Sequence, residues 1–182
     1  MERVFPKNSK VRFAHFALPV TAHEADLRYR YLRPRSGQVE LIEIDLEPRC
    51  DDGTLPHDSA LYEWWRMMLE AGRRSGKSIA YPHNTGVLLQ DARFADIKHQ
   101  EHQLPFSFSA NWVRPGMKTR AEWYNIMVTD PGDRYDPVAT FNAYSMALFT
   151  RYLGLSRAQV DDLVARVSLE VSNPNHHIFH VL

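Results

Sequence analysis

The segment 45–57 holds the densest group of side chains that could carry chemistry. His57 titrates near neutral pH, where an imidazole beside carboxylates can act as a general acid or base. Arg49 and Asp52 supply charges in its neighbourhood, and we take all three as candidate catalytic residues. A structural role is the alternative, because Asp-Asp-Gly-Thr is a good turn sequence and Arg49 could pair with an aspartate to rigidify the loop.

Two further histidines join the candidate catalytic residues because of where they stand in the sequence. His15 lies at the end of a predicted strand, 11–16, on the side where ligands collect in open α/β sheets. His83 lies at a predicted helix start, where the helix dipole disfavours a charged imidazole.

Aromatic side chains form the candidate substrate-binding set, since they suit a flat polyketide or terpenoid substrate. Helical spacing puts Leu61, Met68 and Leu69 on one face of a predicted helix. Trp65 falls on that face, and Trp64 points about 100° away, so we expect Trp64 to line a groove, a pocket or a partner surface. Core packing is the alternative for each aromatic residue. The candidate substrate-binding residues are Trp64, Trp65, Trp112, Trp123, Tyr124 and Tyr81.

No metal site is predicted. His99 and His102 stand three positions apart, so on a strand they would point to opposite faces. Cys50 is the only cysteine, which excludes an internal disulfide and a thiolate zinc site.

The elements that must position these residues follow from hydrophobic periodicity and turn residues. Strands are predicted at 11–16, 39–44, 96–104 (an edge strand) and 178–182, with a loop at 45–57. Helices are predicted at 21–32, 59–75, 85–92, 119–130, 136–153 and 156–170. This order predicts an α/β protein with a large helical insertion near its end.

Caps sharpen the boundaries of the later helices. Asp136 is the expected N-cap of one helix, with Pro137 at its first position. Ser156 opens a capping box at the start of the next helix. Gly76 and Gly154 stand where glycines end helices.

Composition limits the class of protein. The chain has 182 residues, which fits a single domain, residues 1–182. Lys plus Arg and Asp plus Glu each number 22, so no general attraction to nucleic acid or anionic lipid is expected. The start has no apolar signal core, and we expect a soluble, cytoplasmic protein that neither spans nor binds a membrane.

Several sequence blocks together resemble the fungal LaeA-like class I methyltransferases. They are RPRSGQVELIEIDLEPRCDDGTLP, AGRRSGKSIAYP, ARFADIKHQEHQLPF, EWYN, ALFTRYLGLSRAQVDDLVARV and HHIFHVL. The resemblance runs from about Lys10 to the end, and it implies a Rossmann-like class I fold. It also implies a structural role for His177, which matches a histidine of the family, and it places Arg93 where the family usually has glycine.

The departures from this family are as informative as the matches. Such enzymes bind S-adenosylmethionine on a glycine-rich turn, with an acidic residue at the end of the second strand. The chain has eight glycines, none of them before Gly37, and no strand–GxGxxG–helix unit. The resemblance therefore implies a remnant of the class I fold with a reduced sheet of about four strands. It implies that the cofactor-binding βα units are missing, and we expect no cofactor.

Three functions remain open at this point. The leading hypothesis is a cofactor-free enzyme of fungal secondary metabolism, which cyclises, isomerises or rearranges a small-molecule substrate. One alternative is a non-catalytic partner or regulator of a full-length methyltransferase. The other is a methyltransferase whose cofactor site is completed by another chain. Loss of neighbouring strands would leave an open apolar sheet edge, so we also expect a homodimer.

Overall fold

The computed structural model describes the chain in segments, which are residues 10–15, 23, 26, 29–30, 32, 36–81, 83–105 and 136–181. The chain divides into two compact units. The first comprises Met1–Ile44 with Ala80–Gln100, and the second comprises Asp45–Ile79 with Glu101–Leu182. The predicted helix at 119–130 lies outside the described residues, and so does most of the one at 21–32. The single domain stays a prediction.

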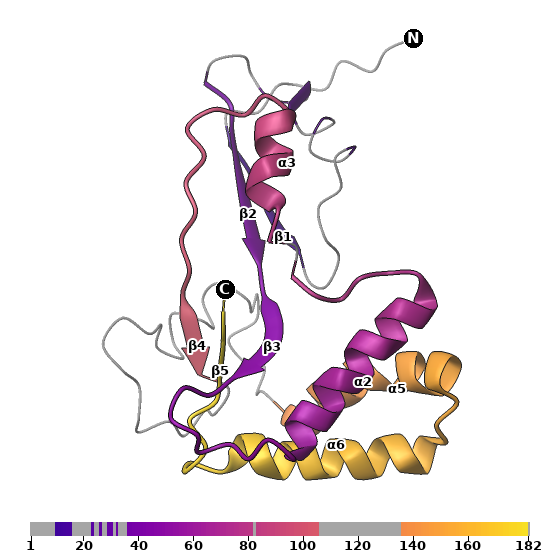
Figure 1. The fold of residues 1–182 in the computed structure, drawn as a ribbon. Coiled ribbons are helices and arrows are strands. Elements are labelled where there is room, and N and C mark those ends of the chain that lie inside the picture. Colours follow the sequence, from indigo (N-terminus) through magenta and orange to yellow (C-terminus); the bar gives the residue numbers. More distant parts are fainter. Residues whose placement is uncertain are drawn as a thin grey trace. The chain divides into compact units, whose positions relative to one another are not determined.

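In the first unit the described residues include a parallel pair of strands and the short helix α3 (Figure 1). Strand β1, Lys10–His15, pairs in register with β2, Gln38–Glu43. Helix α3 is Thr85–Asp91. These elements confirm the strands predicted at 11–16 and 39–44 and the helix predicted at 85–92. Each was predicted from its local hydrophobic pattern.

Helix α3 ends in a left-handed residue that is not glycine. Arg93 has φ +70°, and its N–H donates to the carbonyl of Gln90 at 2.9 Å. The N–H of Phe94 donates to the carbonyl of Leu89 at 3.0 Å, which completes the double hydrogen bond of a Schellman cap. Phe94 then packs on the buried Ala92. A left-handed arginine costs about 1–2 kcal/mol that glycine would avoid.

We expect Arg93→Gly to stabilise the protein by about 1 kcal/mol or less, since relief of the left-handed strain outweighs the chain entropy of glycine. The midpoint of urea unfolding checks this. Gln90→Gly, at an exposed position inside the same helix, is the control and should destabilise by about 1 kcal/mol. Equal destabilisation by both variants would contradict the assignment of Arg93 as a strained left-handed residue at the end of α3.

The second unit has a small antiparallel sheet in the order β3-β5-β4. Its strands are β3, Asp45–Arg49, β4, Gln103–Pro105, and β5, Phe179–Val181. The predicted loop at 45–57 is therefore wrong in its first part. The strand was hidden because it contains Pro48 and pairs irregularly, with a register shift between Asp45 and Arg49. The predicted strand 96–104 is shortened to β4, where Leu104 is fully buried and the preceding residues are polar.

Among the described residues of the second unit, three helices and a π-helical turn pack against one another beside the sheet (Figure 1). They are α2, Ala60–Ser75, α5, Pro137–Leu148, the π-helical turn η1, Phe149–Leu153, and α6, Arg157–Ser172. The predicted caps are confirmed at Asp136, Ser156, Gly76 and Gly154. None of the described helices has the length and apolarity that a membrane crossing requires.

Both tryptophans of α2 lie in the core, which corrects the prediction that Trp64 faces a groove. Trp64 is 1% exposed and Trp65 is 6% exposed. The indole N–H of Trp64 donates to Ser145 Oγ at 2.7 Å, and that hydroxyl donates to the carbonyl of Phe141. This chain satisfies the one polar atom of the buried indole. Leu69, expected in the core, is 37% exposed instead.

A carboxylate from α6 caps the start of α2. Glu170 Oε1 accepts the N–H of Ala60 at 2.9 Å, and Oε2 accepts the N–H of Leu61 at 2.8 Å. Ser59 Oγ accepts the N–H of Tyr62 at 3.3 Å. Three amides that a helix leaves without internal partners are thus satisfied, two of them from a distant part of the sequence. The described residues together form a mixed α/β fold, as expected.

Candidate functional site

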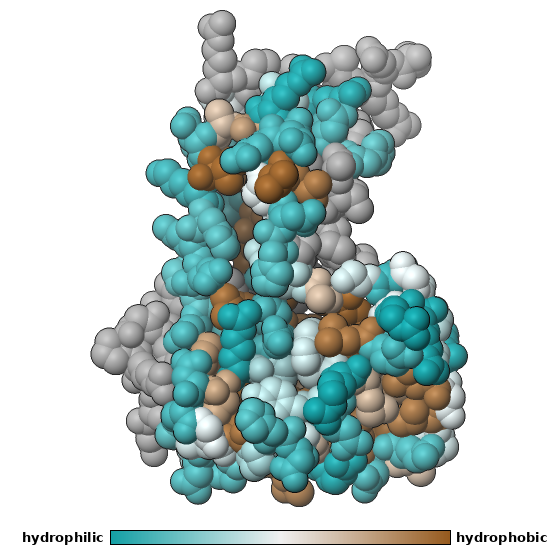
Figure 2. All heavy atoms as spheres, viewed as in Figure 1, coloured by the Kyte–Doolittle hydropathy of each residue, from teal (hydrophilic) through white to brown (hydrophobic). Residues whose placement is uncertain are grey.

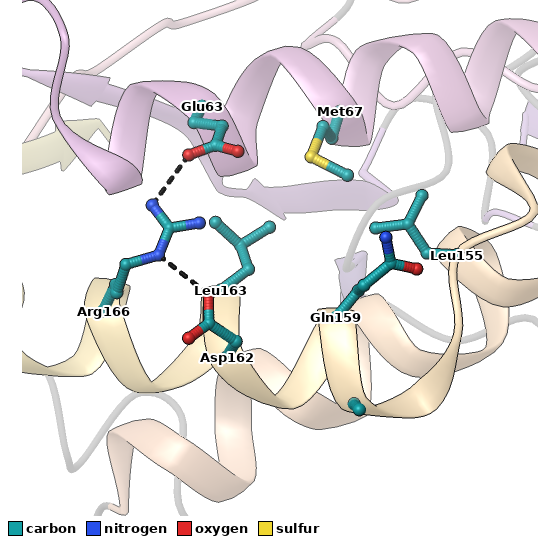
Figure 3. A pocket seen from close by; sticks show the side chains of 8 residues that line it. Glu63, Met67, Leu155, Gln159, Asp162, Leu163 and Arg166 are labelled. Carbon is teal, nitrogen blue, oxygen red and sulfur yellow. Dashed lines mark hydrogen bonds and ion pairs between the residues drawn. The ribbon is translucent and has the colours of Figure 1, made fainter.

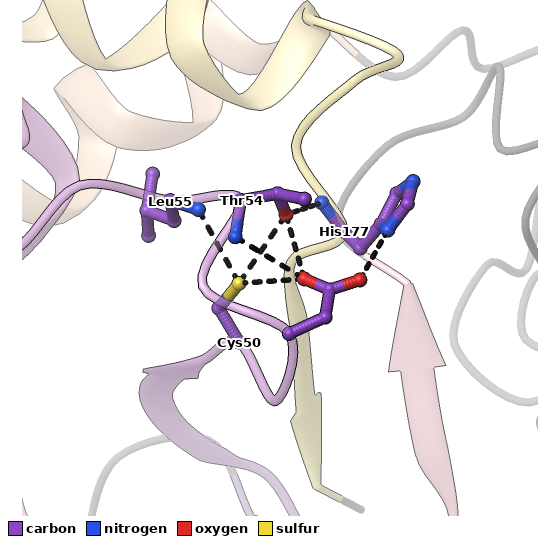
Figure 4. A network of polar contacts seen from close by, with 5 residues as sticks. Cys50, Thr54, Leu55 and His177 are labelled. Carbon is purple, nitrogen blue, oxygen red and sulfur yellow. Dashed lines mark hydrogen bonds and ion pairs between the residues drawn. The ribbon is translucent and has the colours of Figure 1, made fainter.

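A cluster of polar side chains joins the loop after β3 to the segment before β5 (Figure 4). Asp52 Oδ2 lies 2.5 Å from Nδ1 of His177. Asp52 Oδ1 accepts hydrogen bonds from Thr54 Oγ1 at 2.9 Å and from Cys50 Sγ at 3.4 Å. The backbone N–H of His177 donates to Thr54 Oγ1 at 2.8 Å. We call these four residues the polar cluster.

The local sequence explains why the loop takes this shape. The N–H of Thr54 donates to Asp52 Oδ1 at 3.2 Å, so Asp52 closes a turn on its own backbone. Gly53 has φ +73°, which glycine adopts without steric cost. The N–H of Leu55 donates to Cys50 Sγ at 3.3 Å, and Leu55 is buried in the helical core. The turn is thereby anchored to the core at its end.

Electrostatics keep Asp52 ionised. The hydrogen bond from His177 holds the pKa of Asp52 well below its ordinary value of 3.8, and contacts from Thr54 and Cys50 lower it further. A carboxylate at Nδ1 fixes the orientation of the imidazole, and the His177 side chain is 30% exposed. The pair therefore has the geometry of an oriented imidazole at the protein surface.

The predicted catalytic residues of the loop do not share one partner. Asp52 binds His177, whereas Arg49 Nη2 pairs with Asp45 Oδ2 at 2.6 Å, the structural role given as its alternative. The ring of His57 stacks on Tyr62, with centroids 6.3 Å apart. Their role in catalysis stays a prediction.

The remaining predicted residues divide between the first unit and the undescribed part of the chain. Tyr81 and His83 form an edge-to-face contact, with centroids 5.3 Å apart, and His83 is exposed. The backbone of His15 ends β1, and its side chain lies outside the description. Trp112, Trp123 and Tyr124 lie outside the described residues.

Sequence reasoning missed the partnership of Asp52 with His177, which stand 125 positions apart. The sequence offered one hint. Asp52 and His177 both lie in blocks that resemble the LaeA-like family, DDGTLP and HHIFHVL. A neighbouring histidine, His180, is buried, and burial lowers its pKa to about 4. His180 is thus neutral near pH 7.

A groove lies between α2 and the first half of α6 (Figure 3). Its volume is about 390 Å³. Met67, Leu155 and Leu163 form its apolar part. Arg166 spans the two helices at one end, 2.8 Å from Glu63 and 3.1 Å from an oxygen of Asp162.

The described residues lack the glycine-rich turn that holds S-adenosylmethionine in class I methyltransferases. No two described glycines are separated by a single residue, so no GxGxxG sequence is present among them. A Cβ at Gly72 would lie 2.8 Å from Ile79 of the same unit, so the space beside this glycine is filled by the protein itself.

Curated proteins similar to this chain are fungal. The secondary metabolism regulator LAE1 of Cochliobolus heterostrophus is 37% identical over 153 residues, which are 84% of this chain and 46% of that protein. The secondary metabolism regulator laeA of Monascus pilosus is 33% identical over 156 residues, 85% of this chain and 39% of that protein. The protein-methionine methyltransferase laeA of Chaetomium globosum is 32% identical over 144 residues, 79% of this chain and 42% of that protein. No protein-family profile matches, and no solved structure matches significantly.

A mixed α/β chain with these relatives falls in the class of methyltransferase-like proteins. Within that class it belongs with the fungal LaeA-like proteins, which confirms the resemblance. The chain spans less than half the length of these relatives.

The prediction of a cofactor-independent cyclase or isomerase of secondary-metabolite biosynthesis is wrong. The relatives are named as secondary metabolism regulators and as protein-methionine methyltransferases. Packing explains the two aromatic residues of α2 that suggested a substrate pocket, since Trp64 and Trp65 are both buried.

We expect Asp52→Asn to lower the free energy of unfolding by about 1 kcal/mol at pH 7, because the carboxylate that binds His177 is lost at a partly exposed site. The pKa of Asp52 is lower in the folded state, so its contribution is present above pH 3.8 and is lost as the pH falls below it. Urea unfolding of both proteins at pH 7 and pH 3 measures this. A stability difference that did not shrink on acidification would contradict the assignment.

Proposed function

We propose that this chain is a non-catalytic regulator of fungal secondary metabolism, which acts by binding another protein. In this proposal its fold is the remnant of a class I methyltransferase that keeps the part outside the cofactor site. The relatives support it, because they are named as regulators of secondary metabolism. The carrying observation is that the described residues contain no GxGxxG turn, the element on which class I methyltransferases bind S-adenosylmethionine.

The packing of the second unit supports a binding role. The resembling blocks DDGTLP, ALFTRYLGLSRAQVDDLVARV and HHIFHVL fall on the polar cluster, on η1 and α6, and on β5. These elements form one core with α2, which would hold a binding surface in shape without a cofactor.

A methyltransferase completed by another polypeptide is the second candidate, favoured by relatives named as protein-methionine methyltransferases. Transfer of a methyl group from S-adenosylmethionine to a methionine thioether would form the new S–C bond from the sulfur lone pair as S-adenosylhomocysteine leaves. The thioether would lose no proton, so the reaction would need no general base. The oriented imidazole of His177 would therefore have a structural role in either case.

Titration calorimetry with S-adenosylmethionine separates the two functions. We expect no saturable binding by the chain alone, and binding at micromolar concentration by a full-length relative as the control. Deletion of the gene that encodes this chain should change the transcript levels of secondary-metabolite genes in the host. Reintroduction of the wild-type chain should restore them.

Saturable binding of S-adenosylmethionine to the chain alone would overturn the proposal. Binding that appears only when a second polypeptide is added, together with methylation of a methionine-containing peptide, would favour the second candidate. Unchanged transcripts after deletion would contradict a regulatory role.

A further inference from the structure

We propose that the groove between α2 and α6 binds an acidic protein segment that carries an apolar anchor residue. This deepens the proposed function, on which it rests, by naming the surface and the chemistry of the partner. The anchor would enter the apolar part of the groove at Met67, and acidic side chains would meet arginines at its η1 end.

The groove offers apolar surface that the fold leaves accessible. Met67 and Leu155 are only partly buried, and they line the groove beside the buried Leu163. Ala158 is exposed and adds a small side chain to the same wall. At the other end the guanidinium of Arg166 is already engaged by Glu63 and Asp162. A peptide side chain that enters the groove between Met67, Leu155 and Leu163 would therefore be apolar.

Arginines continue the surface beyond the apolar part. Arg74 follows Met67 by seven positions on α2, about two turns or 10 Å further along the same side of the helix. Its Nη1 donates to the carbonyl of Tyr152 at 3.1 Å, in the π-helical turn that precedes Leu155. Arg74 therefore lies next to the groove along two elements, which are α2 (with Met67) and η1 (followed by Leu155).

The charge at this end is positive on a chain that is neutral overall. Glu70 accepts hydrogen bonds from Arg73 and Arg74, which hold its pKa at about 2, so one carboxylate faces two guanidiniums. Arg151 of η1 is exposed and adds another positive charge. Tyr152 is 38% exposed, and arginine with tyrosine is the pair enriched at binding hot spots. Figure 2 shows strongly hydrophilic and hydrophobic side chains side by side over α2.

The spacing defines the partner further. An extended chain rises about 3.3 Å per residue, so three residues span the 10 Å from Met67 to Arg74. An apolar residue followed at the third position by Glu or Asp would reach both. An apolar centre favours a protein segment over nucleic acid, whose binding is dominated by phosphate contacts.

Fluorescence anisotropy with the peptide SGLAAEEGS, labelled with fluorescein, tests this proposal on the full chain. We expect the dissociation constant to rise at least about tenfold when Lys replaces both Glu residues, or Ser replaces Leu, in the peptide. Arg74→Glu should weaken binding by a similar factor, and the charge-matched control Arg157→Glu should leave it unchanged. Arg157 is exposed on α6 and does not line the groove.

Met67→Glu places a carboxylate in the apolar part and should abolish binding. Because Met67 also touches the core, Ala158→Phe provides a second block from an exposed position, and circular dichroism confirms that each variant is folded. Equal binding of the Lys peptide, no binding of either peptide, or tighter binding to duplex DNA or to phosphatidylserine vesicles would each overturn this inference. Those outcomes leave the proposed function standing, because it is tested separately by S-adenosylmethionine binding and by transcript levels.

Discussion

The carboxylate of Glu170 sits near the end of α6, where that helix's own dipole disfavours a negative charge. It is held there by the first amides of α2, whose dipole favours it. This contact fixes the start of α2 against the end of α6. This contact also positions the polar cluster, because the loop that contains Asp52 leads into α2 and the segment that contains His177 follows α6. The groove lies between the same two helices.

Local signals predicted most of the elements. The caps at Asp136, Ser156, Gly76 and Gly154 are short-range chemistry, so the sequence alone could locate the helices that they bound. Strand β3 could not be predicted, because its pairing with β5 comes from residues more than 100 positions away. The burial of Trp64 was equally inaccessible. It requires Ser145, on another helix, to accept the indole hydrogen.

The candidate site was predicted in part. Asp52 was recognised as a candidate, but its partner was sought within the loop and is His177, which only the tertiary fold brings near. No motif in the sequence marked Met67 or Leu163 as groove residues, so the groove was not predicted. The aromatic residues of α2 pointed to a substrate pocket, whereas Trp64 and Trp65 are buried in the core of the second unit. The homodimer stays a prediction.

Amide hydrogen exchange at Ala60 and Leu61, measured by NMR for the wild type and for Glu170→Ala, tests the central claim most directly. We predict faster exchange at both amides in the variant and a loss of about 2 kcal/mol in the free energy of unfolding, the cost of removing hydrogen bonds to a charged group. Asp162→Ala, which removes an exposed carboxylate of the same helix, should cost about 0.5 kcal/mol and leave both amides protected. Unchanged exchange and unchanged stability in Glu170→Ala would contradict the account.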